Sequence, residues 1–162
     1  MQLLGEEHME IKTKRLALIN KEEAQSLFTT MAEVFAEDCV PLNDSYIERL
    51  LCRGEFWAVA ALADGILVGG IIAHELPMTR SESSELFIYD IAVKPEYQRR
   101  GIGRRLFLAL CEEASKAGIR DVFVSADDDD VHALDFYRNL GGVASPVTDF
   151  DFSSSLRAKP SA

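Results

Sequence analysis

The sequence predicts an α/β (α+β) fold, with a mixed central sheet of about six to seven strands flanked by helices on both faces. Two observations support this prediction. Strand patterns at 56–63 and 66–74 are joined by Asp64-Gly65, a dipeptide typical of a tight antiparallel hairpin. Farther along, a strand pattern at 86–93 is separated from another at 121–125 by a helical pattern, and such a crossover joins parallel strands. A sheet with both kinds of neighbour is mixed.

The elements before the hairpin follow from apolar spacing. A weak alternation predicts a first strand over 10–19. Helical spacing then predicts a helix over 21–36, with Asn20 as its N-cap, and a short helix over 45–52.

The elements after the hairpin include the crossover helix, predicted over 103–117 and stopped by Gly118. Helical spacing predicts a further helix over 131–140, and one or two strands are expected in 143–152. We therefore expect a single domain at 10–152, with flexible termini at 1–9 and 153–162.

Composition narrows the class of protein. The chain has 162 residues and a formal net charge of −10, which disfavours nucleic acid as a partner and suits a cationic substrate. No apolar run approaches the ~20 residues of a membrane span, so we expect no membrane partner and a cytoplasmic location. Cys39, Cys52 and Cys111 lack paired spacing and are expected to be reduced, buried thiols, and the three histidines form no metal-ligand motif.

The segment between the strand at 86–93 and the following helix is the most informative. Pro95 ends the strand, and Gln98-Arg99-Arg100-Gly101-Ile102-Gly103-Arg104 opens the helix. Glycines allow backbone amides to approach a ligand, and a helix start carries unpaired N–H donors with partial positive charge. Together with the arginines, this arrangement predicts a site for a pyrophosphate group.

Gln98-x-x-Gly101-x-Gly103, after a strand ending Ile91-Ala92-Val93, resembles the coenzyme A signature of the GCN5-related N-acetyltransferases (GNAT superfamily). The resemblance implies acetyl-CoA as co-substrate and no metal. It also implies that the strands at 86–93 and 121–125 splay apart and that the backbone of Ile91, Ala92 and Val93 binds the pantetheine arm. The expected coenzyme-binding residues are Ile91, Ala92, Val93, Gln98, Arg99, Arg100, Gly101, Ile102, Gly103, Arg104 and Asp130, the last standing where many members have Asn.

Two residues are candidates for proton transfer. Asp90 interrupts an apolar strand, and removal from water would raise its pKa toward that of a general base; the alternative is a structural aspartate. Tyr137 lies in a run, Ala133 to Gly141, that resembles the GNAT helix whose tyrosine is a general-acid candidate; the alternative is a core residue.

Acidic residues outside the strand suggest an amine acceptor. Asp127-Asp128-Asp129-Asp130 is either a solvated helix cap or part of an acceptor site that attracts cations. The expected substrate-binding residues are Glu85, Asp127, Asp149 and Asp151.

Longer motifs resemble the aminoglycoside 3-N-acetyltransferases of GNAT type: Glu85 to Val93, Ala126-Asp127-x-x-Asp130, Phe136-Tyr137 and Phe150-Asp151. This resemblance implies transfer of acetyl to the 3-amine of an aminoglycoside antibiotic by direct attack, and hence antibiotic resistance. The sequence leaves open whether the protein is a monomer or a homodimer. Two alternatives remain: an acetyltransferase for another amine (a polyamine, small metabolite or peptide N-terminus), and a non-catalytic acetyl-CoA-binding sensor.

Overall fold

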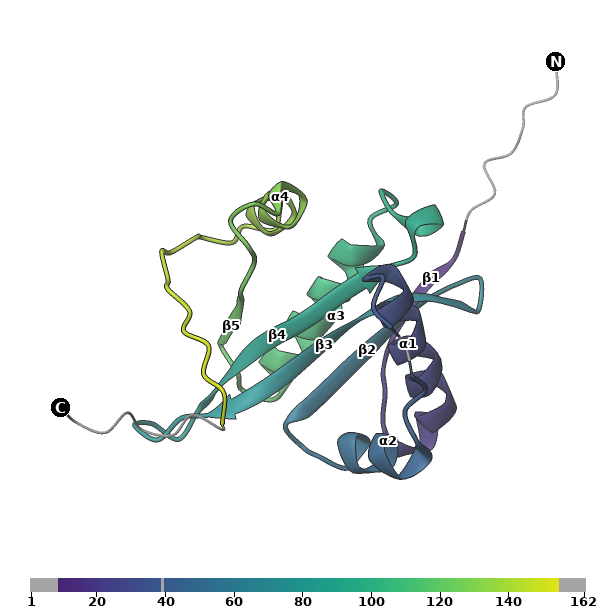
Figure 1. Ribbon diagram of the computed structural model, residues 1–162, viewed down its shortest axis with the longest axis horizontal. Coiled ribbons are helices and arrows are strands. Elements are labelled where there is room, and N and C mark those ends of the chain that lie inside the picture. The colour runs from purple at the N-terminus through teal and green to yellow at the C-terminus, as the bar shows by residue number, and fades with distance from the viewer. Residues whose placement is uncertain (1–8, 39, 155–162) are drawn as a thin grey trace, which may run out of the picture. The chain divides into compact units, whose positions relative to one another are not determined.

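Five strands form one sheet, in the order β1-β2-β3-β4-β5, in the computed structural model, which describes residues 9–38 and 40–154 (Figure 1). The first four strands are antiparallel neighbours, and β5 runs parallel to β4. The mixed sheet is confirmed, with five strands instead of six to seven. The strands are β1 (Ile11–Arg15), β2 (Phe56–Ala63), β3 (Ile66–Pro77), β4 (Ser84–Val93) and β5 (Asp121–Val124).

Helices cover both faces of this sheet, as predicted. On one face lies α3 (Ile102–Lys116), whose side chains at helical spacing, Ile102, Leu106, Leu110 and Ala114, are all buried. On the other face lie α1 (Lys21–Val34) and α2 (Asp44–Leu51), which pack through Leu27, Met31 and Ile47 on Ala58, Ala60, Ile72 and Ala92 of the sheet. The two apolar clusters place opposite faces of every central strand in a core.

The chain divides into two compact units, one ending at Ser125 and the other beginning at Ala126. The first contains the sheet with α1, α2 and α3. The second contains α4 (Val131–Asn139) and the residues that follow it.

The strands expected in 143–152 are absent. Residues 142–153 have no regular secondary structure, and Val143, Val147, Phe150 and Phe152 are exposed. An alternating pattern forms a strand only against a neighbouring strand, and Pro146 lacks the N–H that such a ladder needs.

Three local predictions were wrong. The first strand ends at Arg15, and a 3-10 turn (Leu18–Asn20) follows. Asn20 does not cap α1, because its side-chain oxygen accepts from the Ala17 N–H at 3.1 Å instead. Cys52 is exposed and Cys111 is half-buried, so neither is a core thiol. The expected N-terminal segment before Met9, Cys39, and the tail beyond Ser154 lie outside the described residues.

Candidate active site

The loop between β4 and α3 is held in place by hydrogen bonds to β3 and to the end of β4. The Lys94 N–H donates to the Val68 carbonyl at 2.8 Å, and the Gln98 side-chain amide donates to the Val93 carbonyl at 2.9 Å. Arg99 (φ 61°) and Gly101 (φ 76°) then adopt the left-handed conformation, and α3 starts at Ile102. These two positive φ values turn the chain from strand to helix, and only at Gly101 is that conformation free of side-chain strain.

Four guanidinium groups surround this helix start: Arg99, Arg100, Arg104 and Arg105. All four residues are exposed, and within 9–38 and 40–154 none of them forms an ion pair with a carboxylate. The first N–H groups of α3 have no acceptor inside the helix and carry its partial positive charge. Ile102 is buried in the core, so its contribution is the backbone amide. The donors present therefore fit a pyrophosphate group.

In the C-terminal half of β4, one backbone edge is not paired with another strand of the described chain. Its pairing with β5 ends where Ile88 meets Val124, whereas β4 continues to Val93 (Figure 1). The other edge of this half stays paired with β3, from Gly69 opposite Val93 to Ile72 opposite Asp90. An open edge beside Ile91, Ala92 and Val93 can bond an extended amide-bearing chain as an added strand would.

A β-bulge decides where Asp90 points. Ile72 of β3 pairs with Asp90 whereas Ala73 pairs with Ile88, so Tyr89 is the extra residue. Ile88 lies in the core beneath α3, and Ile72 lies in the core beneath α1. Without the bulge, Asp90 would share the face of Ile88, two residues before it. The bulge moves Asp90 to the α1 face.

The surroundings of Asp90 favour its protonated form. Partial burial raises the pKa of Asp90 above its ordinary value, the nearby Glu37 carboxylate raises it further, and the charge of His74 opposes them. Glu37 follows the left-handed Ala36 (φ 53°), which ends α1 and turns the chain. A carboxylate so placed is a stronger base than an exposed aspartate.

Glu37 and His74 are functional candidates that sequence reasoning missed. Glu37 lies just beyond the helix predicted over 21–36, and His74 is one of three histidines without a metal motif. Only the register of β3 with β4 brings His74 near Asp90, and no spacing in the sequence reveals it. Glu85, by contrast, pairs with Leu76 five positions before Asp90, about 17 Å along a strand, so the structure does not bring it together with Asp90.

The other predicted residues belong to the second unit. Asp130 caps α4, because its carboxylate accepts from the Ala133 N–H at 3.0 Å, while Asp127 is an exposed loop residue. Tyr137 is half-buried on α4, with its ring 5.2 Å from that of Phe136. Asp149 and Asp151 are exposed in the irregular segment after the helix. Their roles at the site remain predictions.

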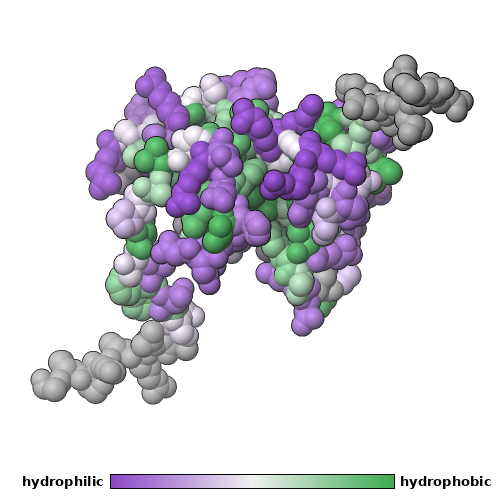
Figure 2. Space-filling model, turned by 90° about the horizontal axis from the view of Figure 1, so that it is seen from above, coloured by the Kyte–Doolittle hydropathy of each residue, from purple (hydrophilic) through white to green (hydrophobic). Residues whose placement is uncertain are grey.

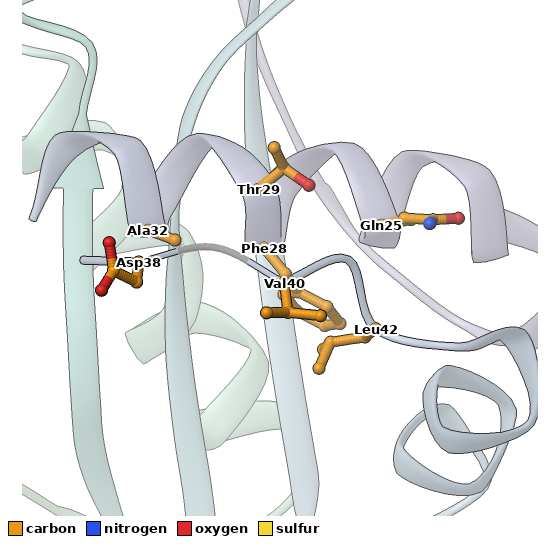
Figure 3. A pocket seen from close by; sticks show the side chains of 7 residues that line it. All are labelled: Gln25, Phe28, Thr29, Ala32, Asp38, Val40 and Leu42. Atoms are coloured by element: carbon orange, nitrogen blue, oxygen red, sulfur yellow. The ribbon is translucent and has the colours of Figure 1, made fainter. Parts of the chain in front are cut away.

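A small pocket lies between α1 and the chain that follows it (Figure 3). It has a volume of about 200 Å³. Phe28, Val40 and Leu42 meet at its centre, with Asp38 toward one end and Gln25 toward the other; Thr29 and Ala32 complete the lining. The pocket offers an apolar surface with one carboxylate, that of Asp38, the residue after Glu37.

Within residues 9–38 and 40–154, no three His, Cys, Asp or Glu side chains are grouped so that they could hold a metal ion. In the same ranges, no helix is long and apolar enough to cross a membrane. The face seen in Figure 2 is mostly hydrophilic, with smaller hydrophobic areas between the polar side chains.

Similar proteins carry the same fold along most of this chain. An aminoglycoside acetyltransferase, HMB0005, from an uncultured soil metagenomic sample is 33% identical with a TM-score of 0.84, over 91% of this chain and 100% of that one. A second, meta-AAC0020 from the same kind of source, solved in complex with sisomicin, is 30% identical with a TM-score of 0.84, over 88% and 95%. N-alpha-acetyltransferase RimI of Mycobacterium tuberculosis is 32% identical over 78% of this chain and 76% of its own.

The family model described as "Acetyltransferase (GNAT) family" matches residues 21–141, which include α1, the sheet from β2 to β5, the loop between β4 and α3, and α4. Acetyltransferases of this family use acetyl-CoA. The chain belongs to the GNAT family of N-acetyltransferases.

Proposed function

We propose that this enzyme transfers acetyl from acetyl-CoA to an amine of an aminoglycoside, the 3-amine of the deoxystreptamine ring. The observation that carries the proposal is Asp90, a half-buried carboxylate of raised pKa beside the open edge of β4. It is a base for a cationic amine, adjacent to the backbone that would receive the acetyl donor.

In the proposed reaction the substrate ammonium gives a proton to Asp90, directly or through one water. The neutral nitrogen attacks the thioester carbonyl carbon, and the C–S bond breaks. A backbone N–H within 91–93 stabilises the negative charge that develops on the carbonyl oxygen. The attacking nitrogen releases its second proton to water, and Tyr137 donates a proton to the departing thiolate and is reprotonated from water. The products are an N-acetylated amine and coenzyme A.

Coenzyme binding is assigned to the loop and the strand edge. The loop binds the pyrophosphate through backbone amides and guanidinium groups of Gln98, Arg99, Arg100, Gly101, Ile102, Gly103 and Arg104. The strand edge binds the pantetheine arm through the backbone of Ile91, Ala92 and Val93. Asp130 caps α4, and Ala133 N–H already occupies one of its oxygens, which leaves the other for the pantetheine amide.

The aminoglycoside as acceptor is supported by charge and by relatives. The formal net charge of −10 and the Asp90–Glu37 carboxylates suit a polycation. The two aminoglycoside acetyltransferases described above are at least 30% identical to this chain, and one of them was solved in complex with sisomicin. Asp127, Asp149 and Asp151 add carboxylates that would attract further ammonium groups, and Glu85 would do so at the far end of β4.

A second candidate acceptor is the α-amine of a peptide. It is favoured by the likeness to N-alpha-acetyltransferase RimI, whose sequence identity to this chain, 32%, is close to the 33% of the aminoglycoside acetyltransferase HMB0005. The two acceptors differ in charge, since a peptide N-terminus carries one ammonium where an aminoglycoside carries several.

The test is a mass spectrum of sisomicin incubated with enzyme and acetyl-CoA, with an Ala-starting peptide in parallel. A singly acetylated sisomicin, with the acetyl located at the 3-amine by NMR, is the expected product. Asp90→Asn should lower kcat by about 10²-fold while acetyl-CoA affinity is unchanged. Acetylation of the peptide alone would overturn the assignment in favour of the second acceptor.

A further inference from the structure

A continuous row of six aromatic rings crosses the α1 face of the sheet beside Asp90. Successive centroids lie 6.1, 5.6, 5.6, 6.0 and 5.1 Å apart. The first four contacts are edge-to-face and the last is tilted. In order, the row consists of Phe28, Phe56, His74, Tyr89, Phe87 and Phe123.

The strand register explains why these rings share one face. Phe56 pairs with His74, His74 pairs with Phe87, and Phe87 pairs with Phe123, so these four side chains lie on one face of the sheet. Phe56 also packs against the cluster beneath α1, which fixes the face as that of Asp90. The bulged Tyr89, although unpaired, turns its ring onto His74.

The row changes from buried to open along its length. Phe28 and Phe56 are half-buried beside α1, whereas Tyr89 is 63% and Phe123 is 42% exposed. Cross-strand stabilisation alone does not require a large exposed ring next to a carboxylate of raised pKa. Ring faces carry negative potential and attract cations and the polarised C–H bonds beside them.

We propose that Tyr89, with His74 and Phe87 beside it and Phe123 next in the row, binds the flat face of a ring in the acceptor and so selects cyclic polyamines over open-chain ones. This inference rests on the proposed function, since it takes the acceptor amine to lie at Asp90. The ring of a cyclic amine covers the Tyr89 face while its ammonium reaches Asp90 and Glu37. An open chain reaches the same carboxylates but covers little of the aromatic face.

The experiment compares two acceptors of equal amine count: sisomicin and an open-chain polyamine. Tyr89→Ala should raise KM for sisomicin about tenfold, the scale of one ring contact, with kcat within about twofold and KM for the open chain unchanged. Tyr89→Phe keeps the ring and should behave as the wild type. Phe123→Ala should raise KM for sisomicin by a few-fold, because it lies farther along the row.

Ile66→Ala is the matched control, since Ile66 is an exposed strand side chain of similar exposure, 57%, at the β2–β3 turn. It should leave both acceptors unaffected. A purely structural role for Tyr89 would lower the thermal midpoint without changing the ratio of the two KM values. If Tyr89→Ala changes KM equally for both acceptors, or for neither, the proposed role of Tyr89 is overturned. The proposed function still stands in that case if the wild-type enzyme acetylates sisomicin. Absence of wild-type turnover, with calorimetric titration showing no sisomicin binding, overturns both.

Discussion

Gly69 is a position where the neighbouring strand leaves no room for a side chain. Gly69 lies in β3 opposite Val93, the last residue of β4. A Cβ built there would collide with the Ala92 carbonyl oxygen and stand 2.8 Å from the Val93 Cα. Both obstacles are backbone atoms, so Gly69→Ala can be accommodated only if β4 moves away from β3.

The expected cost follows from that collision. Overpacking costs about 1–3 kcal/mol, and replacing glycine reduces unfolded-chain entropy, which offsets up to about 1 kcal/mol. A net loss of about 1–2 kcal/mol lowers Tm by about 2–8 °C in a chain of this length. Because the displaced residues are Ala92 and Val93, whose backbone is assigned to the pantetheine arm, KM for acetyl-CoA should rise as well.

Thermal unfolding and initial rates over a range of acetyl-CoA concentrations measure the two effects. Gly54→Ala is the control, because a Cβ at Gly54 meets nothing within 4 Å. It should leave both quantities near those of the wild type. If Gly69→Ala had the same Tm and the same KM as Gly54→Ala, β4 would not be packed as tightly on β3 as the structure shows, and the coupling to coenzyme binding would be refuted.

Three further perturbations test the site. Glu37→Gln removes a carboxylate that raises the pKa of Asp90. The pKa of Asp90 should therefore fall, and the acidic limb of the pH profile of kcat/KM should shift to lower pH. An unchanged limb would show that Glu37 does not influence the group that titrates there. Gly101→Asp should abolish acetyl-CoA binding in calorimetric titration, whereas Gly101→Ala shares the φ 76° strain, adds no charge, and should retain more affinity; equal losses would attribute the effect to strain. Rising salt should increase KM for an aminoglycoside more than for a singly charged amine, and Asp128→Asn with Asp129→Asn should flatten that slope with little change in Tm; equal slopes for both amines would make the run a solvated helix entry.

The elements that sequence predicts well are those whose partner surface is local or repeated. α3 places an apolar side chain on one face at every turn, and each of those side chains is buried. β2 and β3 are fixed by the tight Asp64-Gly65 turn. The segment 143–152 is different, because its alternation has no paired strand within the described chain, and a strand is a property of two segments.

At the site, the grouping of residues that follow one another in a motif was predictable from sequence. The grouping of residues from distant segments was not. Gln98, Gly101 and the arginines follow one another in the sequence, so their grouping at a helix start needs only local structure. Glu37 and His74 come from the end of α1 and from β3, and they reach Asp90 only through the packing of α1 on the sheet and the register of β3. No periodicity in one strand encodes a register between two.

The bulge at Tyr89 determines the face of the sheet on which Asp90 lies. A regular β4 would send Leu86, Ile88, Asp90 and Ala92 to one face, which mixes a carboxylate into the α3 core. The extra residue sends Leu86 and Ile88 to the α3 core and Ala92 to the α1 core, each with an apolar face of its own. Asp90 then shares the α1 face with Glu37 and His74, and Tyr89 stands beside it with its ring exposed. One inserted residue thus keeps both cores apolar and brings a carboxylate of raised pKa next to an aromatic surface, at the cost of one unpaired position in the ladder.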